Sequence, residues 1–539
     1  MKTLYISIIA LIGISINSMA QDKSRKEKEG DKYSFRYAFD KAINSYNHTK
    51  KLTPDGQRKL AEGHQNLNQT VDAEIVYSKL IANGESIIPI DYYNYAMILK
   101  TNGKYEESGK QMDKFLTLVP NDLRAKSYFN NKKKLGELLK DDGKYKIEHL
   151  NINTDAQDFG TSYYNNKIIF TSTRATPKII KRKYNWNGKP FLDMYVSDLD
   201  GIQLKEPEIF DKNLDSKFHD GPASFSNNGT YMAFTKNHSH DKSKDKVVEL
   251  QIWLSNFDGK KWEEPTPFLY NNTEYQVGQP CLTQDGKTMY FVSDMPGGFG
   301  GADIYRVTKG DGGEWSKPEN LGNKINTEGD EVFPFIEEKN EILFFSSNGH
   351  FGLGNLDIFM CAMNGTNFGN VRNAGTPLNT KYDDFSIITD SMATKGYFSS
   401  NRTGGSGDDD IYSVEILKDL GIDKKIKGIA KDKDENPVAN TFISLFDDKN
   451  NIIDTITTSD KAAYVFLVEP NKDFKLTGKK TKYNDGTTNT NTSGKEYIIK
   501  ADVIMLAKEE VKAPTKAEIV DQKIQEGNDL GKIEELELN

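Results

Sequence analysis

The chain has 539 residues, of which 28% are charged and 11% are aromatic, and its formal net charge is -8. At about 100–200 residues per domain, this length predicts three or four domains, and the aromatic content is typical of folded, strand-bearing chains rather than disordered ones. The acidic balance disfavours nucleic acid as a partner, because proteins that bind it usually carry a basic surface.

Residues 1–20 are predicted to be a secretory signal. Lys2 forms a short basic region, residues 4–15 are apolar, and the small residues Ser18 and Ala20 precede Gln21. Such a segment is too short to span a bilayer and is removed on export. No cysteine lies near the expected cleavage point, so we expect an exported protein without a lipid anchor.

Residues 31–140 have the apolar spacing of paired helices. The side chains expected on the packing faces are Ala73, Tyr77, Leu80, Tyr92, Tyr95, Ala96, Leu99, Ser108, Met112 and Phe115. Gly103 and Tyr105 are expected in the turn of the second pair, and Pro120 ends it. The two units repeat after about 35 residues, close to the period of tetratricopeptide repeats. This region resembles that family; an unrelated stack of helical hairpins is the alternative.

A motif recurs five times between residues 144 and 418. Each copy has an aromatic residue followed by Ser or Thr, a polar turn that is often Gly-rich, and a further apolar strand that mostly begins with Asp. The acidic or Gly-containing segments that precede the copies are about 53 to 62 residues apart, as in multi-strand repeats. The copies at 293–305, 346–359 and 399–412 resemble the TolB-like, WD-related repeats of exported bacterial proteins. We therefore expect a five-bladed β-propeller, with six blades as the alternative.

The sequence also predicts how the propeller ring closes, because one copy lacks a strand and one predicted strand belongs to no copy. The last copy lacks a fourth strand, and residues 144–152 precede the first copy as an unassigned strand. We expect this segment to pair with the strand that contains Ile411 and Val414. Closing the ring in this way removes exposed sheet edges.

Asp193, Asp303, Asp357 and Asp410 occupy one position of the repeat, in the turn that starts a strand. An aspartate there can accept backbone N–H groups of a tight turn, so we interpret all four as structural residues. Asp408 and Asp409 are added before Asp410, behind a Gly-rich run. Because hard cations take oxygen ligands, a weak cation site in this loop is the alternative.

Residues 424–506 alternate apolar and polar side chains, which is typical of strands. Gly428, Ala430, Asp432, Pro437 and Tyr464 carry a resemblance to the carboxypeptidase-regulatory-like β-sandwich. Residues 507–539 are charged and are predicted to be a linker or tail. The fold class is therefore multidomain α + β, with a helical domain, a propeller and a sandwich.

No motif for catalysis, cofactor binding or metal binding is recognisable. Cys281 and Cys361 are expected to be buried thiols, with one disulfide as the alternative. His238, His240 and Asp241 lie in a lysine-rich loop and are expected to be solvated. The basic insertion with Lys178, Lys181, Arg182 and Lys183 is expected to be a solvated loop or a docking point for an acidic partner.

The order of modules resembles the PorE-like group of periplasmic proteins of Bacteroidota, in which an OmpA-like peptidoglycan-binding domain follows. Residues 526–539 look like the lead-in to that domain, where the sequence stops, and its diaminopimelate-binding residues have no counterpart. The resemblance implies a non-catalytic periplasmic scaffold for type IX secretion or gliding-adhesin machinery. It implies a PorP/SprF-like outer-membrane protein as the partner, and peptidoglycan only through the missing domain. The alternatives are a sensor or enzyme that uses the propeller channel, and a structural accessory of a glycan-uptake complex.

Overall fold

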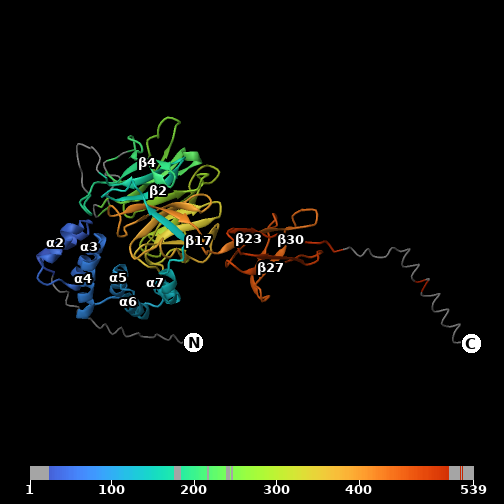
Figure 1. The fold of residues 1–539 in the computed structure, drawn as a ribbon, viewed down its shortest axis with the longest axis horizontal. Coiled ribbons are helices and arrows are strands. Elements are labelled where there is room, and N and C mark those ends of the chain that lie inside the picture. The colour runs from blue at the N-terminus through green and yellow to red at the C-terminus, as the bar shows by residue number, and fades with distance from the viewer. Residues whose placement is uncertain are drawn as a thin grey trace, which may run out of the picture. The chain divides into compact units, whose positions relative to one another are not determined.

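The structure is a computed structural model, and it describes residues 23–174, 184–237 apart from 215 and 217, 243–244, 247–508, 523 and 525. The chain is a multidomain α+β protein with helices at the N-terminal end and sheets in the rest (Figure 1). It divides into two units, which meet between Ile422 and Asp423. The predicted signal and nearly all of the tail lie outside the described residues. Among the described helices, none is long and apolar enough to cross a membrane.

Paired helices open the first unit. They are α1 (Arg25–Ser34), α2 (Phe39–Asn47), α3 (Pro54–Asn66), α4 (Thr70–Asn83), α5 (Pro89–Thr101), α6 (Tyr105–Leu118), α7 (Leu123–Asn131) and α8 (Leu135–Leu138). Pro54 and Pro89 occupy the first helical position, where a missing N–H costs no hydrogen bond. Successive helices pack as hairpins, α3 on α4 and α5 on α6.

The predicted packing faces of α4 and α6 are confirmed. Ala73, Tyr77 and Leu80 are the buried side chains of α4, and Ser108, Met112 and Phe115 are those of α6. On α5, Ala96 and Leu99 are buried as expected, whereas Tyr92 and Tyr95 are only half-buried. Tyr93 is buried in their place, because its side of the helix faces the sheets.

Antiparallel sheets follow the helices, and in the described residues there are five of them before Ile422. The first contains β2 (Asp158–Tyr164), β3 (Lys167–Ser172), β4 (Asp193–Asp200), β5 (Gln203–Leu204) and β6 (Glu208–Ile209). The second contains β7 (Asp220–Ser226), β8 (Tyr231–Asn237), β9 (Leu250–Asn256) and β10 (Thr266–Pro267). The third contains β11 (Val277–Leu282), β12 (Thr288–Ser293), β13 (Asp303–Thr308) and β14 (Glu319–Asn320).

The last two of these sheets complete the set. The fourth contains β15 (Glu331–Glu337), β16 (Ile342–Ser347), β17 (Asp357–Asn364), β18 (Asn367–Phe368) and β19 (Arg372–Asn373). The fifth contains β20 (Asp384–Thr389), β21 (Lys395–Ser400), β22 (Asp410–Ile416) and β1 (Tyr145–His149). The first strand of each sheet contacts the first strands of the two neighbouring sheets, so β2, β7, β11, β15 and β20 form a closed, propeller-like ring.

The expected ring closure is confirmed. Strand β1, from the beginning of the ring, pairs antiparallel with β22, from its end. Ile147 lies opposite Val414, and His149 lies opposite Tyr412. The N-terminal strand therefore covers the outer edge that β22 would otherwise expose.

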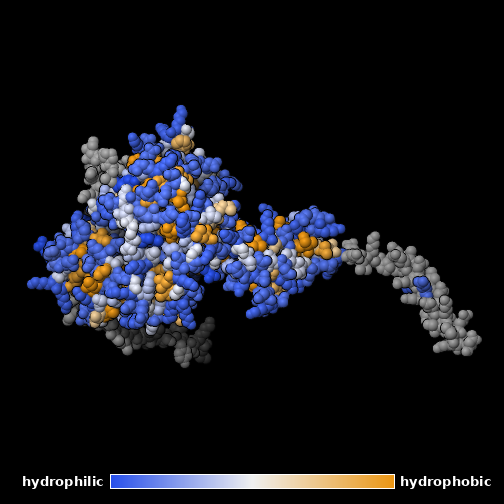
Figure 2. Space-filling model, in the orientation of Figure 1, coloured by the Kyte–Doolittle hydropathy of each residue, from blue (hydrophilic) through white to orange (hydrophobic). Residues whose placement is uncertain are grey.

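The ring has no single core, because each pair of neighbouring sheets packs its own apolar cluster. Ile168 and Phe170 of the first sheet pack with Ile388 and Ile411 of the fifth, for example. Cys281 and Cys361 lie together in the cluster between the third and fourth sheets, and both are buried thiols. Their interpretation as buried thiols is confirmed. Polar residues cover most of the face seen in Figure 2, and the apolar ones form small separate groups.

The second unit consists of two sheets over one core. One sheet contains β23 (Lys424–Lys431), β26 (Ala463–Val468), β29 (Ile498–Lys500) and β30 (Val503–Ile504). The other contains β24 (Phe442–Phe446), β25 (Ile452–Thr457), β27 (Asp473–Lys479) and β28 (Gly486–Asn491). Ile426, Ile443, Phe466 and Leu476 belong to the shared core. Their alternation with exposed residues is what the sequence pattern indicated.

Candidate functional site

Buried acids begin the central strands. Asp158, Asp220, Glu331 and Asp384 stand at the first position of β2, β7, β15 and β20, and each is at most 1% exposed; Val277 takes this place in β11. A backbone N–H four residues earlier donates to each acid, at 2.8 Å from Thr154, 2.6 Å from Ser216, 2.6 Å from Thr327 and 2.5 Å from Thr380. This loop-to-strand bond fixes how the chain enters the ring.

The charge of these acids is compensated differently from sheet to sheet. Arg174 lies 2.6 Å from Asp158, and Arg402 lies 2.5 Å from Asp384. In the fourth sheet the matching position is Gly349, so Glu331 has no arginine. Burial raises the pKa of Glu331 to about 8.

The four predicted turn aspartates lie next to this row. Asp193, Asp303, Asp357 and Asp410 begin β4, β13, β17 and β22, and all four are buried. Asp303 accepts the backbone N–H of Phe299 at 2.6 Å, Asp357 that of Gly354 at 3.0 Å, and Asp410 that of Ser406 at 2.7 Å. In three sheets the acid of the first strand, a serine of the second and the aspartate of the third stand side by side. This row of acid, serine and aspartate is therefore a structural feature that recurs from sheet to sheet.

Asp408, Asp409 and Asp410 are held by different partners. Asp408 is exposed and pairs with Lys189 at 2.6 Å, whereas Asp409 is half-buried and accepts the side-chain N–H of Gln157 at 2.9 Å. Burial raises the pKa of Asp409 to about 7. In the part of the chain that the structure describes, no group of His, Cys, Asp or Glu is arranged to hold a metal ion.

A loop of the ring packs against the surface formed by α5, α6 and α7. This loop, residues 348–353, joins β16 to β17. The Tyr93 hydroxyl donates to the backbone oxygen of Asn348 at 2.6 Å, and the Tyr105 hydroxyl donates to that of Leu353 at 3.1 Å. Phe351 packs on the apolar cluster of these helices. This part of the helical surface is therefore already occupied by the chain itself.

A second contact joins the N-terminal helices to the first sheet. Trp186, in the insertion between β3 and β4, donates its indole N–H to the backbone oxygen of Asn66 at 3.0 Å. Its ring also stacks on Tyr37, with centroids 5.8 Å apart, and meets Phe39 edge-on. The loops with Trp186 and Phe351 join second to third strands, and Glu328, which accepts the backbone N–H of Leu123, lies just before β15. The helices therefore lie at the end of the ring where the central strands begin.

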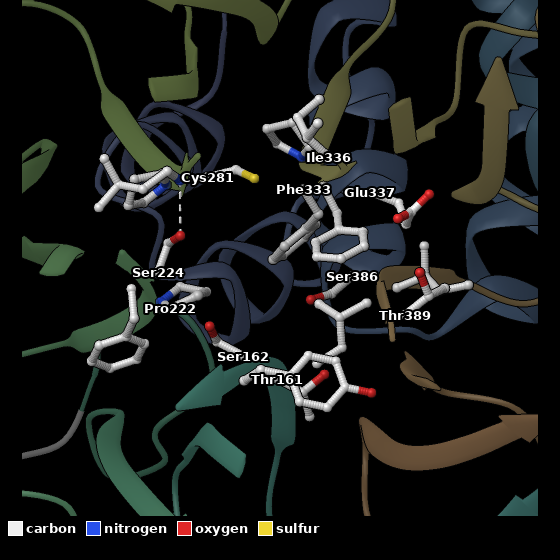
Figure 3. Close-up of a pocket in the computed structure, with 18 of the residues that line it drawn as sticks. Thr161, Ser162, Pro222, Ser224, Cys281, Phe333, Ile336, Glu337, Ser386 and Thr389 are labelled. Atoms are coloured by element: carbon white, nitrogen blue, oxygen red, sulfur yellow. Dashed lines mark hydrogen bonds between the residues drawn. The ribbon is translucent and has the colours of Figure 1, made fainter. Parts of the chain in front are cut away.

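A cavity of about 630 Å³ lies at the opposite end of the ring channel. All five central strands contribute to its lining (Figure 3). Phe333 closes its inner side, packed at 5.1 Å from Phe385 and 6.4 Å from Phe159 between ring centroids. Glu338 and Lys339 line its outer side and are exposed, so the cavity reaches solvent there.

Each central strand has a β-bulge just before this cavity. The residues with a left-handed φ at these bulges are Gly160, Gly221, Gln279, Phe333 and Ser386. A bulge sets two residues against one on the neighbouring strand and redirects the side chains that follow. A φ of 51° at a residue as bulky as Phe333 is rare, and such strain is concentrated at functional sites.

The side chains after the bulges differ from strand to strand. Two residues after the left-handed position the five strands carry Ser162, Ala223, Cys281, Phe335 and Ile388, and all five line the cavity. Burial raises the pKa of the Cys281 thiol to about 12, so this sulfur stays protonated and is a poor nucleophile.

Sequence reasoning pointed elsewhere for a docking site. Lys178, Lys181, Arg182 and Lys183 lie outside the described residues, as do His238, His240 and Asp241. The cavity-lining residues were missed, although the sequence shows that the equivalent residues Ser162, Ala223 and Cys281 differ from copy to copy.

Comparisons with known proteins give a coarse result. No family model and no curated protein matches the chain. Solved structures that match include a TolB-like protein from Agrobacterium tumefaciens, with 13% identity over 60% of this chain and 98% of that one and a TM-score of 0.31. An α-L-arabinofuranosidase from Lactobacillus brevis matches with 12% identity over 54% and 95%, at a TM-score of 0.34. An endo-arabinase from Bacteroides thetaiotaomicron matches with 12% identity over 51% and 96%, at 0.31.

These likenesses do not decide between an enzyme and a binding protein. Several of the matching structures are glycoside hydrolases. At such identities and TM-scores, their activities carry no argument about this chain. The geometry of its own side chains has to supply the functional proposal.

Proposed function

We propose that this protein is a non-catalytic periplasmic scaffold that holds an outer-membrane assembly. We further infer that the ring is a five-bladed propeller, that the helices are tetratricopeptide-like, and that the second unit is a sandwich of the carboxypeptidase-regulatory type. The partner we propose is an integral outer-membrane protein of the PorP/SprF-like kind, in type IX secretion or gliding-adhesin machinery. If an OmpA-like domain follows in the full gene, it would tether this assembly to peptidoglycan.

The observation that carries this proposal is the way in which helices and ring are joined. Tyr93, Tyr105 and Trp186 each donate a hydrogen bond to a backbone oxygen across the contact. Phe351 of the ring is also part of the packing of the helices. Two modules fixed in this way present one continuous surface, as a scaffold requires, and loops on a rigid support are where recognition usually lies.

Binding of a ligand in the ring channel is a second candidate function. It is favoured by one observation: the cavity lining is specific to each strand, while the other end of the channel repeats. A cavity of this volume lies in the range of small-ligand sites. The two functions are compatible, since a partner can place one of its own segments in the cavity.

Co-purification tests the scaffold. Tagged full-length protein, recovered from detergent-solubilised outer membranes, is expected to bring an integral β-barrel protein with it. Replacing Lys178, Lys181, Arg182 and Lys183 by serine is expected to weaken this recovery if the basic insertion docks the partner. Replacing Lys260 and Lys261, which are exposed in another loop of the ring, is the matched control.

The scaffold proposal fails under one clear result. This result is a tagged protein that fractionates as a free periplasmic monomer, together with a deletion strain that keeps secretion, motility and surface adhesion. Channel binding would then be the leading function.

A further inference from the structure

Three carboxylates stand along one side of the channel cavity. Glu337 ends β15, Glu338 follows it, and Asp390 follows β20. Each accepts a backbone N–H: Glu337 from Lys339 at 3.0 Å, Glu338 from Gln284 at 2.6 Å, and Asp390 from Thr394 at 2.8 Å. These bonds hold the three acids in place at the rim.

No described lysine, arginine or histidine forms an ion pair with these acids. Lys339 lines the same cavity, but its ammonium group points to the sulfur of Met392, at 2.7 Å. Glu337 is only 2% exposed, and burial raises its pKa, with the charge of Asp390 adding to the effect. Hydrogen bonds from backbone N–H groups and from the Thr394 hydroxyl hold these acids, but no cation among the described residues offsets their charge, and a buried carboxylate without a cation is costly.

Two buried hydroxyl groups in the lining also have no partner. The side-chain oxygens of Thr161 and Thr389 make no hydrogen bond, although these residues are 5% and 3% exposed. They come from β2 and β20, and Figure 3 shows Thr161 at the bottom of the cavity and Thr389 at its right side. Buried polar atoms are nearly always satisfied in folded proteins, so two unpaired hydroxyls in the cavity lining point to a guest with polar groups, and such hydroxyls can accept from its N–H donors.

The inner side of the cavity offers an apolar surface to the same guest. Phe333 and Pro222 line this side of the cavity (Figure 3). Aromatic faces attract the cationic head of arginine or lysine, and the alkyl stems of both residues pack well on apolar surfaces. The apolar surface suits the alkyl stem of a long basic side chain, and the hydroxyl groups and the acidic rim suit its charged head.

We propose that the cavity binds a basic segment of a partner protein, with an arginine or lysine side chain inserted toward the acidic rim. The volume of about 630 Å³ leaves room for the neighbouring residues of the segment as well. A metal ion is a poorer guest, because no described group of acids is arranged to coordinate one. This inference rests on the proposed binding role of the channel, and it adds the chemistry of the partner.

Isothermal titration of the full chain with an oligo-arginine peptide, at about 0.15 M salt to screen diffuse attraction, tests the inference. An oligo-glutamate peptide and a Gly-Ser peptide are the control ligands. We expect saturable binding of oligo-arginine only. Hydrogen exchange of the complex is expected to show protection in residues 335–339 and 387–391, the strand ends that carry the acids.

Two charge-reversal variants distinguish binding in this cavity from nonspecific attraction of the basic peptide to an acidic protein. Glu338→Lys is expected to weaken oligo-arginine binding about tenfold or more, as for loss of one member of a close charge pair. Glu264→Lys changes the net charge equally at an exposed position outside the cavity, and it is expected to leave binding within about twofold. Acidification should also weaken binding at a pH above the ordinary range of glutamate, because Glu337 takes up its proton early.

Several results would overturn the inference. They are equal binding to both variants, protection outside the cavity, equal affinity for the Gly-Ser peptide, and no binding at all. Failure of the scaffold proposal looks different, because oligo-arginine would still bind at the cavity while no membrane protein co-purifies.

Discussion

The two ends of the ring channel follow opposite rules. Where the central strands begin, acids, serines and aspartates recur in the same places, as in Asp384, Ser400 and Asp410. Where the strands end, equivalent positions carry residues as different as Ser162, Cys281 and Phe335. The repeated residues are those that build the ring, because each sheet contains the same turn and needs the same hydrogen-bonding side chains to form it. We propose that divergence marks the end at which the ring recognises a partner.

A second contrast lies within the repeating end. Asp384 is buried against Arg402, whereas Glu331 is buried with hydroxyl and backbone donors and no arginine. The same position is thus filled by a compensated acid in one sheet and by an uncompensated one in another. Unfolding experiments can decide whether this difference in charge compensation changes the stability of the ring.

Removal of β1 is expected to have the largest effect. Deleting residues 145–149 uncovers the edge of β22 and opens the ring, so we expect the unfolding free energy of the ring to fall by more than about 5 kcal/mol. Urea unfolding followed by circular dichroism measures it. Removing β14, an outer strand that joins no distant parts of the chain, is the matched control and should cost much less. Equal losses would show that β1 does not close the ring.

Loss of the arginine from the compensated acid comes next. Arg402→Ala leaves Asp384 buried without its cation, and we expect a loss of about 3–5 kcal/mol in unfolding free energy. Arg306→Ala removes the exposed pair with Glu319, at 2.7 Å, and should cost about 0–1 kcal/mol. Similar values for both variants would mean that the repeating end does not depend on charge compensation.

The uncompensated acid should show itself in the pH dependence of stability. The pKa of Glu331 is about 8 in the folded chain and about 4.3 when unfolded. Its contribution to stability is therefore complete below pH of about 4.3 and is lost as the pH rises through about 8. Glu331→Gln stays neutral, so its stability relative to the wild type should rise with pH across this window, by up to about 5 kcal/mol, because each unit of pKa shift corresponds to about 1.4 kcal/mol. A flat difference would indicate that Glu331 is already ionised at low pH.

The smallest effects concern the three consecutive aspartates. Asp410→Ala removes an acceptor of turn N–H groups and is expected to cost about 1–2 kcal/mol. Asp408→Ala, at an exposed side chain that pairs with Lys189, is expected to be nearly neutral. Thermal unfolding of both variants measures the difference. Tight calcium binding that Asp408→Ala abolishes would restore the cation-site alternative for this loop.

Much of the ring could be predicted from the sequence, because repeated turns and alternating apolar residues report local structure. The pairing of β1 with β22 followed from one missing strand and one spare strand. Contacts between modules could not be predicted in this way. Tyr93 is buried and Phe351 half-buried at the contact between helices and ring, and the apolar spacing within one module carries no information about its neighbour. The cavity-lining residues could not be predicted, because the bulge in each central strand adds one residue. This residue shifts the alternation of inward and outward side chains on which a strand prediction relies. The lack of a cation at Glu331 becomes visible only when Gly349 is aligned with Arg402.

Site-specific photocrosslinking in intact cells tests most directly whether the diverging end of the channel is the binding end. A photoreactive residue placed at Lys339, on the exposed rim of the cavity, is expected to crosslink to one envelope protein. The same residue at Glu264, exposed on another part of the ring, should give no such product. Crosslinks from Glu264 to a partner, with none from Lys339, would contradict the proposal that this protein recognises its partner through the channel cavity.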